Sequence, residues 1–250
     1  MKKINTYITE KLKINKVKKV EHTLFPKTRD ELKKMIADEI EQNGYECSLN
    51  HIDVSQITDM FTVFQDSKFN GDISQWDVSN VERMTRMFKN SKFNNDISNW
   101  NVSSVTDMEE MFYKSKFNGD IFAWNVSNVE NMGAMFQYSE FNQDISEWNV
   151  SNVKNMAYMF EFSKFNGNIS NWDVSNVEDM SCMFNCSIFN MNISNWDVSN
   201  VEDMSCMFSE SRFNQDISNW KINPNCNTIR IFYYCPIEEK YKPSKDGKKL

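Results

Sequence analysis

The chain has few residues of the kinds that build catalytic and metal sites. Of 250 residues only two are histidine, His22 and His51, and neither has a cysteine or histidine partner at ligand spacing. The six cysteines include no C-x-x-C pair, and no serine–histidine–aspartate arrangement, phosphate-binding loop or H-E-x-x-H motif is present. We therefore expect no enzymatic activity, no metal and no cofactor; an enzyme built here would have to use His22, His51 and Cys47.

Long apolar runs and glycine are also scarce. No stretch approaches the roughly 18 apolar residues that indicate a membrane span. The basic opening of the chain is followed neither by an apolar segment nor by a lipobox-like cysteine, so a signal peptide or lipid anchor is not predicted and the default location is the cytoplasm. The 6 glycines are too few for a calcium-binding β-roll.

Basic residues are outnumbered in the middle of the chain. The formal net charge is −7, and residues 51–235 hold 12 basic and 24 acidic side chains, whereas both ends carry a small basic excess. An acidic array repels the phosphate backbone of nucleic acids, so a nucleic-acid partner is not expected.

What the chain has in abundance is a 24-residue period, which phenylalanine and methionine follow together with tryptophan. One unit reads F-N-x-[DN]-I-x-x-W-[DN]-V-S-[NS]-V-x-x-M-x-x-M-F-x-x-S-x. Such a period is typical of repeat proteins, whose single units cannot bury their own apolar face. We predict about seven and a half coils over residues 47–235. The tryptophans of the period are Trp76, Trp100, Trp124, Trp148, Trp172, Trp196 and Trp220.

The pattern within one unit predicts an α/β repeat solenoid. Residues 69–76 alternate in a way that favours a short parallel strand, residues 77–80 favour a polar turn, and the spacing in 81–88 favours a helical turn. This is the plan of a leucine-rich repeat with other apolar residues in place of leucine. The tryptophans, set among isoleucine and valine, are expected to form a core ladder rather than a platform on which sugars or bases stack.

The flanks of the repeats are expected to act as a cap and a tail. Residues 1–46 predict a small α/β cap with a short helix over 5–14 and a second helix that begins after Thr28 and ends at Gly44. Terminal segments of repeat arrays shield the open end of the core. Residues 236–250 are polar and predict a loose C-terminal tail.

The repeat unit also carries a family resemblance. The string FNGDISQWDVSNVERMTRMF and its copies resemble the repeats of BspA-like leucine-rich-repeat surface proteins, a repeat that also occurs in mycoplasma lipoproteins as a domain of unknown function. The resemblance covers about 190 residues. It implies a curved repeat scaffold with a role in protein interaction or adhesion, frequently at a cell surface.

Function is expected in the positions that break the period. Apolar residues stand there in slots that are mainly polar in other coils, and we expect them to bind a protein partner, with Tyr158 and Phe162 as anchors. The candidate partner-binding residues are Phe122, Tyr138, Tyr158, Phe162, Ile188 and Met191. We expect a monomeric, non-catalytic scaffold; the alternative is a structural accessory protein of a phage particle or a cell envelope.

Two further ladders have a structural and a chemical interpretation. Aspartate or asparagine recurs at Asp72 and each later unit, where a side-chain oxygen either accepts a backbone N–H in a turn or contributes to a Ca²⁺ site. Cys182 and Cys206 share one slot in neighbouring coils and are expected to be small, half-buried residues rather than a disulfide or metal pair.

Overall fold

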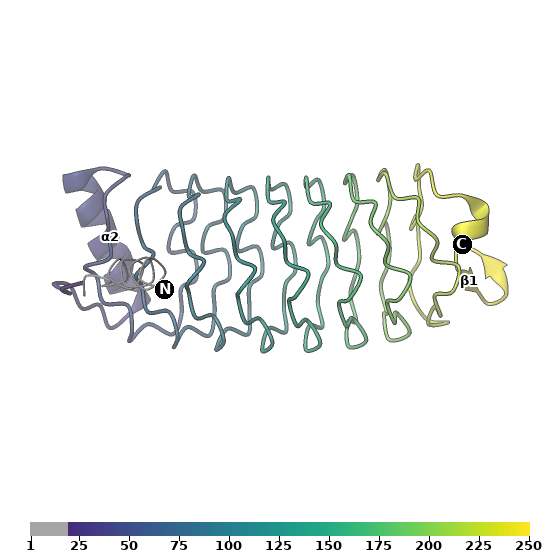
Figure 1. The fold of residues 1–250 in the computed structure, drawn as a ribbon, viewed down its shortest axis with the longest axis horizontal. Helices are drawn as coiled ribbons and strands as arrows, with labels where there is room; N and C mark the ends of the chain where they lie inside the picture. The colour runs from purple at the N-terminus through teal and green to yellow at the C-terminus, as the bar shows by residue number, and fades with distance from the viewer. Residues whose placement is uncertain (1–19) are drawn as a thin grey trace, which may run out of the picture.

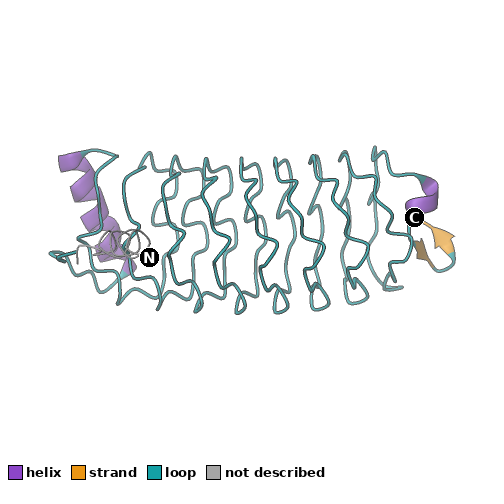
Figure 2. Cartoon of the chain, viewed as in Figure 1, coloured by secondary structure: helices purple, strands orange, loops and turns teal. Residues whose placement is uncertain are grey.

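The computed structural model describes residues 20–250, which form an elongated stack of coils (Figure 1). Successive coils lie side by side along the long axis, in chain order from the N-terminal to the C-terminal end. Regular secondary structure is found in the described residues only at the two ends (Figure 2). The chain is therefore a repeat protein whose coils are made of turns.

Each coil contains a run of consecutive tight turns, which we call the tandem-turn segment. In the segment 84–91 the Met87 amide donates to the Met84 carbonyl at 3.1 Å, and the third residue of that turn, Arg86, has a positive φ of 57°. Positive φ at this position is the mark of a type II turn, and a second turn of the same form ends at Ser91. The equivalent segments are 60–67, 84–91, 108–115, 132–139, 156–163, 180–187, 204–211 and 228–235.

Alternate amides of these segments hold neighbouring coils together. The Met84 amide donates to the Asp107 carbonyl and the Phe88 amide to the Met111 carbonyl, both at 2.9 Å. A single parallel bridge joins each coil to the next, starting with Asp59 and Arg83. The backbone groups that turns leave free are thus satisfied by the neighbouring coil, which a buried loop requires.

The prediction of a strand and a helical turn in each coil is wrong. Residues 69–76 form no ladder between coils, and residues 81–88 contain an isolated bridge and turns in place of a helix. Tandem turns place Met84, Met87 and Phe88 on the inner side just as one helical turn would. A spacing of three and four residues therefore does not distinguish a helical turn from a pair of stacked type II turns.

Where no backbone ladder joins neighbouring coils, side-chain oxygens accept the backbone amides instead. The Oδ1 atom of Asn70 accepts the Asn94 amide of the next coil at 2.8 Å, and the same bond recurs from coil to coil. Within the coil, Asp72 Oδ1 accepts the Ser74 amide at 2.9 Å, and the Asp and Asn residues 24 apart do the same. The Asp72 ladder is thus occupied by turn hydrogen bonds.

The core is a set of aromatic columns that run the length of the stack. Phe88 stacks on Phe112 of the next coil with ring centroids 5.6 Å apart, and within its own coil it stacks on Phe93 at 4.5 Å. The seven tryptophans are only 3–4% exposed, and each indole N–H donates to a carbonyl of the preceding coil, as Trp100 does to Ile73 at 3.1 Å. Each ring is therefore fixed by packing on both faces and by a hydrogen bond.

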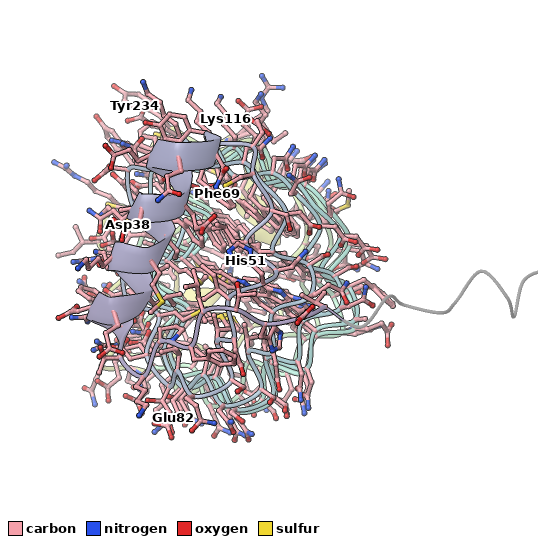
Figure 3. All side chains as sticks on the ribbon, turned by 90° about the vertical axis from the view of Figure 1, so that its left-hand side faces the viewer. Asp38, His51, Phe69, Glu82, Lys116 and Tyr234 are labelled. Atoms are coloured by element: carbon pink, nitrogen blue, oxygen red, sulfur yellow. The ribbon has the colours of Figure 1, made fainter. Side chains whose placement is uncertain are left out.

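Helix α2 (Arg29–Asn43) covers the N-terminal end of the stack (Figure 3). The Thr28 side chain accepts the Glu31 amide, and Gly44 ends the helix with a φ of 84°. Leu32 and Ile36 are buried against the first coil. The bounds and the apolar stripe of this helix are as predicted; the helix predicted over 5–14 lies outside the described residues.

The C-terminal residues pack on the last coil, which corrects the prediction of a loose tail over 236–250. They form the 3₁₀ helix η1 (Glu239–Tyr241) and the antiparallel pair β1 (Ser244–Lys245) and β2 (Lys248–Lys249). Ile237 is buried, and the Ile217 amide donates to the Tyr241 carbonyl at 3.1 Å. A few apolar residues suffice to dock a polar segment because the exposed end of the core must be covered.

Candidate functional site: the tandem-turn face

The strongest candidate site is the surface formed by the tandem-turn segments of the middle coils together with the residue before each segment; we call it the tandem-turn face. It comprises residues 107–115, 131–139, 155–163 and 179–187. The coil backbone is the same in each of them, but the outward side chains differ from coil to coil. Among the described residues, this face combines exposed aromatic rings, a hollow and carboxylates.

Two outward positions of each segment have the left-handed backbone conformation. All sixteen such residues have φ between 52° and 59°, and none is glycine. A left-handed residue with a side chain costs roughly 1–2 kcal/mol relative to right-handed backbone. The inter-coil hydrogen bonds impose this conformation, so even Tyr138 and Phe162 adopt it, at φ of 57° and 52°.

Tyr138 and Phe162 occupy the same slot in neighbouring coils and form an exposed aromatic ridge. Their rings stack with centroids 4.6 Å apart and planes 7° from parallel. The two residues are 42% and 44% exposed. Tyr113 of the preceding coil meets Tyr138 edge-on at 5.9 Å, so three aromatic rings form one continuous surface.

A hollow of about 400 Å³ lies beside this ridge. Its floor includes Gly133, Ala134 and Ala157, and Tyr158 lines it as well. In the two preceding coils the slots of Gly133 and Ala134 hold larger side chains, among them Thr85, Arg86 and Glu110. A Cβ atom at Gly133 would lie 2.9 Å from the side-chain amide nitrogen of Asn155, so a larger residue there would displace that amide.

Carboxylates line the same hollow in two different states. Glu110 receives the Arg86 guanidinium at 3.0 Å and the Lys89 ammonium. Burial opposes its ionisation, but these cations outweigh burial and lower the pKa of Glu110. Burial, followed by the charges of Asp107 and Glu110, raises the pKa of Glu109. Glu109 therefore carries a charge that its surroundings do not balance.

Tyr158 connects the hollow to the cysteines of the next coils. The neighbouring Cys182 thiol, then burial and the carboxylates of Glu161 and Asp179, raise the pKa of the Tyr158 hydroxyl. Burial, followed by the nearby Cys206, raises the pKa of the Cys182 thiol to about 12. Thiolate is the reactive form of cysteine, so Cys182 is an unreactive packing residue at neutral pH.

The structure brings some of the predicted partner-binding residues together and separates others. Tyr138 and Phe162 form the ridge, and Tyr158 lines the hollow. Phe122 is exposed in a different turn of its coil, where its amide donates to Asp120 Oδ1. Ile188 is exposed outside the tandem-turn segments, and Met191 is partly buried against the core. No ring–ring contact among residues 20–250 joins Phe122 to the ridge.

The sequence prediction missed the small and acidic residues of the hollow, because small side chains give no apolar signal. It also missed a second exposed group at the C-terminal end, where Tyr233 and Tyr234 lie with ring centroids 4.2 Å apart. Tyr234 is 76% exposed and points away from the core in Figure 3. It occupies the slot of Phe162, three periods later, so extending the slot would have found it.

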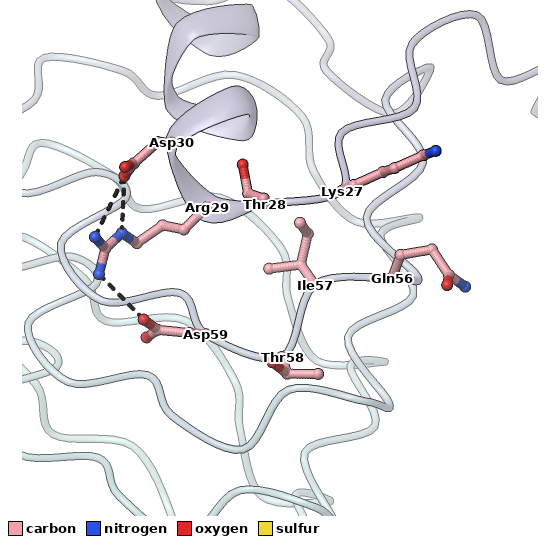
Figure 4. Close-up of a pocket in the computed structure, with 8 residues that line it drawn as sticks. All are labelled: Lys27, Thr28, Arg29, Asp30, Gln56, Ile57, Thr58 and Asp59. Atoms are coloured by element: carbon pink, nitrogen blue, oxygen red, sulfur yellow. Dashed lines mark hydrogen bonds and ion pairs between the residues drawn. The ribbon is translucent and has the colours of Figure 1, made fainter.

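The N-terminal cap offers a smaller hollow of about 240 Å³, which Lys27, Thr28 and Thr58 help to line (Figure 4). The guanidinium of Arg29 is held there by Asp30 at 3.3 Å and Asp59 at 3.1 Å. Arg29, Asp30 and Asp59 are therefore paired with one another, whereas the Lys27 ammonium takes part in none of the ion pairs among residues 20–250.

The residues left to a catalytic hypothesis each lie near a carboxylate. His51 lies 3.3 Å from Glu39 and His22 lies 3.6 Å from Asp53. Burial, followed by the charge of Glu39, raises the pKa of the Cys47 thiol, which disfavours a nucleophile. No group of three or more potential metal ligands occurs among residues 20–250, and no helix among them is long and apolar enough for a bilayer span.

The repeats match a known family along most of the chain. The model of the family described as "Mycoplasma protein of unknown function, DUF285" matches residues 30–140, 93–185 and 134–241 in three overlapping places. Neither the curated proteins nor the solved structures include a match. Because the matches together span well over half of the sequence, the chain belongs to this family of unknown function.

Proposed function

We propose that the protein is a non-catalytic scaffold that binds a protein partner through the tandem-turn face of its middle coils. The observation that carries this proposal is the exposed stacked pair of Tyr138 and Phe162. Aromatic residues contribute most to binding energy at protein interfaces. The two rings are held by a strained backbone that the core imposes, so they are already ordered before a partner arrives.

The covered ends of the stack support a monomeric scaffold rather than a structural subunit that grows by end-to-end stacking. Helix α2 covers one end and the segment from η1 to β2 covers the other. Open repeat ends associate with one another, whereas capped ends do not. Light scattering should therefore give the mass of one chain, 29.6 kDa; a large assembly would favour an accessory component of a phage particle or an envelope.

We also propose that the coil is a variant of the leucine-rich-repeat plan and that the protein acts in adhesion, as the BspA-like resemblance implies. What supports this is the unit F-N-x-[DN]-I-x-x-W, with one side of the coil joined by inter-coil backbone bonds and another by an asparagine ladder. Asparagine ladders satisfy turn backbones in leucine-rich repeats as well.

A selection with randomised peptides tests the proposed interface. The intact protein is the target, and the Tyr138→Ser/Phe162→Ser variant is the comparison. Peptides selected on the protein are expected to lose binding to this variant. Phe122→Ser is the matched control, because it removes an equally exposed ring from another turn. Selected peptides that bind the double variant unchanged and lose binding to Phe122→Ser would place the interface elsewhere.

A further inference from the structure

The hollow beside the ridge has a shape that the sequence creates in one place of the stack. Small residues at 133, 134 and 157 leave about 400 Å³ between the acidic wall of the preceding coil and Tyr158. Two coils earlier the same slots hold Thr85 and Arg86, and Arg86 reaches Glu110 of the coil between them. The hollow is therefore large enough for one long side chain, and it opens next to the aromatic ridge.

Unbalanced negative charge lies on both sides of the hollow. Glu109 on one wall and Asp179 on the other take part in none of the ion pairs among residues 20–250. Asp179 uses one oxygen, Oδ1, to accept the Ser181 amide at 2.8 Å, which leaves its charge without a cation. The four segments of the tandem-turn face hold five carboxylates and a single ammonium group, that of Lys114.

The aromatic residues of the same surface already hold ammonium groups of the chain itself. The Lys114 ammonium lies 5.2 Å from the centre of the Tyr113 ring and 5.1 Å from that of Tyr138. The Lys89 ammonium also lies near the Tyr113 ring, 4.6 Å from its centre. Cations within about 6 Å of an aromatic centroid are attracted by the ring, so this surface suits cations and apolar groups together.

We infer that the partner is a basic polypeptide segment, which places a lysine or arginine side chain in the hollow between Glu109 and Asp179 and an apolar side chain on the ridge of Tyr138 and Phe162. This inference rests on the proposed function and adds the chemistry of the partner. The carboxylates balance the cation, Tyr158 contacts its alkyl chain, and the stacked rings bury the neighbouring apolar group. Acidic polypeptides and anionic lipid surfaces are repelled by the same carboxylates.

Three labelled synthetic peptides of equal length test the inference by fluorescence anisotropy with the full chain. One alternates lysine and phenylalanine, one glutamate and phenylalanine, and one lysine and serine. The first is expected to bind, and the other two to bind at least about tenfold more weakly, since both charge and apolar contact are needed. Failure of the lysine–phenylalanine peptide to bind, or equal binding of all three, would overturn the inference.

Two matched variants assign the charge effect to the hollow. The Glu109→Gln/Asp179→Asn variant keeps the size of both side chains and the turn acceptor at residue 179. It is expected to lower the affinity for the lysine–phenylalanine peptide about tenfold. Glu147→Gln/Glu202→Gln removes two exposed carboxylates that do not line the hollow, and it is expected to leave affinity within about twofold. Thermal melts establish that all variants are folded.

The ridge variant separates the two proposals. If Tyr138→Ser/Phe162→Ser abolishes peptide binding while the Glu109→Gln/Asp179→Asn variant binds normally, the interface stands and the cationic partner is wrong. If both variants bind like the original chain, both proposals fail. If both variants lose binding of the lysine–phenylalanine peptide and the Glu147→Gln/Glu202→Gln control binds it normally, both proposals are supported.

Discussion

Two columns of residues run along the same stack, and the residue type is constant in one and varies in the other. The inner column holds tryptophan at every position from Trp76 to Trp220, whereas the outer slot holds Asn90, Lys114, Tyr138 and Phe162 in successive coils. Both have a constant backbone. The inner residues must repeat because each flat ring packs on its neighbours at close-packed density. The outer residues vary because the backbone there is fixed by inter-coil hydrogen bonds and not by its side chains.

A second contrast lies within the tandem-turn segments themselves. In the segment 84–91 and just before it, Arg83 and Arg86 pair with Asp59 and Glu110 of the neighbouring coils. The segments 132–139 and 156–163 have no basic residue and present aromatic and small side chains instead. The coil of segment 84–91 thus pairs its own charges, whereas the middle coils leave aromatic rings and carboxylates unpaired. This is why we place the interface in the middle coils.

The largest effect is expected from the inner column. Trp148→Ala removes a ring that is 3% exposed, together with its hydrogen bond to the Ile121 carbonyl. We expect a loss of about 3–5 kcal/mol in the free energy of unfolding, measured by urea denaturation. Intact stability with lost partner binding would instead make the tryptophan a contact residue.

A smaller effect is expected from the asparagine ladder. Asn142→Ala deprives the Asn166 amide of an acceptor that lies 2.9 Å away, and we expect a cost of about 1 kcal/mol in unfolding free energy. Asn142→Asp keeps the oxygen and serves as the control. Equal losses in both variants would show that the side-chain oxygen is not what stabilises this turn.

The strained outer slot predicts an unusual order of substitutions. At Phe162, with φ of 52°, glycine avoids the left-handed penalty of roughly 1–2 kcal/mol that alanine keeps, although it loses more chain entropy. Phe162→Gly should therefore unfold with a free energy about 0.5–1 kcal/mol higher than Phe162→Ala. Chemical denaturation of the two variants measures the difference, and the reverse order would mean that the slot is unstrained.

The smallest effects are expected from the two carboxylates of the hollow, and they have opposite signs. The folded-state pKa of Glu109 lies above the ordinary glutamate value of 4.5, so its ionised form destabilises the fold and this penalty disappears as the pH falls through that pKa. The folded-state pKa of Glu110 lies below 4.5, so its contribution is present above pH 4.5 and is lost as the pH falls through the lowered pKa.

Glu109→Gln should therefore slightly stabilise the protein at pH 7, and Glu110→Gln should destabilise it. Urea midpoints at neutral and acidic pH measure both effects. A basic peptide bound in the hollow favours ionised Glu109, so its affinity should fall as the pH drops through the raised pKa. Shifts of the same sign in the two variants would contradict the different environments of these neighbours.

Much of the fold can be predicted from the period alone. The buried positions, such as Phe88 and Trp100, follow from recurrence. Helix α2 follows from the capping pattern of Thr28 and Glu31. The coil conformation cannot be predicted in the same way, because tandem turns and a helical turn bury the same side chains. The docking of residues 236–250 was also missed, since their polar composition hides the few apolar contacts that hold them.

Of the candidate site, the ridge could be predicted and the hollow could not. Tyr138 and Phe162 stand out as aromatic residues in a slot that is mainly polar in other coils. Gly133 and Ala157 contribute only the space that their small side chains leave open. Glu109 contributes a negative charge that no cation of the chain pairs with.

The sequence by itself determined the 24-residue unit, the identity of the core columns and the slots that vary. Only the tertiary structure decided that the coil consists of stacked turns, because alternate amides of these turns donate to carbonyls of the next coil. It also decided which varied slots meet, since contact between Tyr138 and Phe162 depends on how the coils are aligned along the stack.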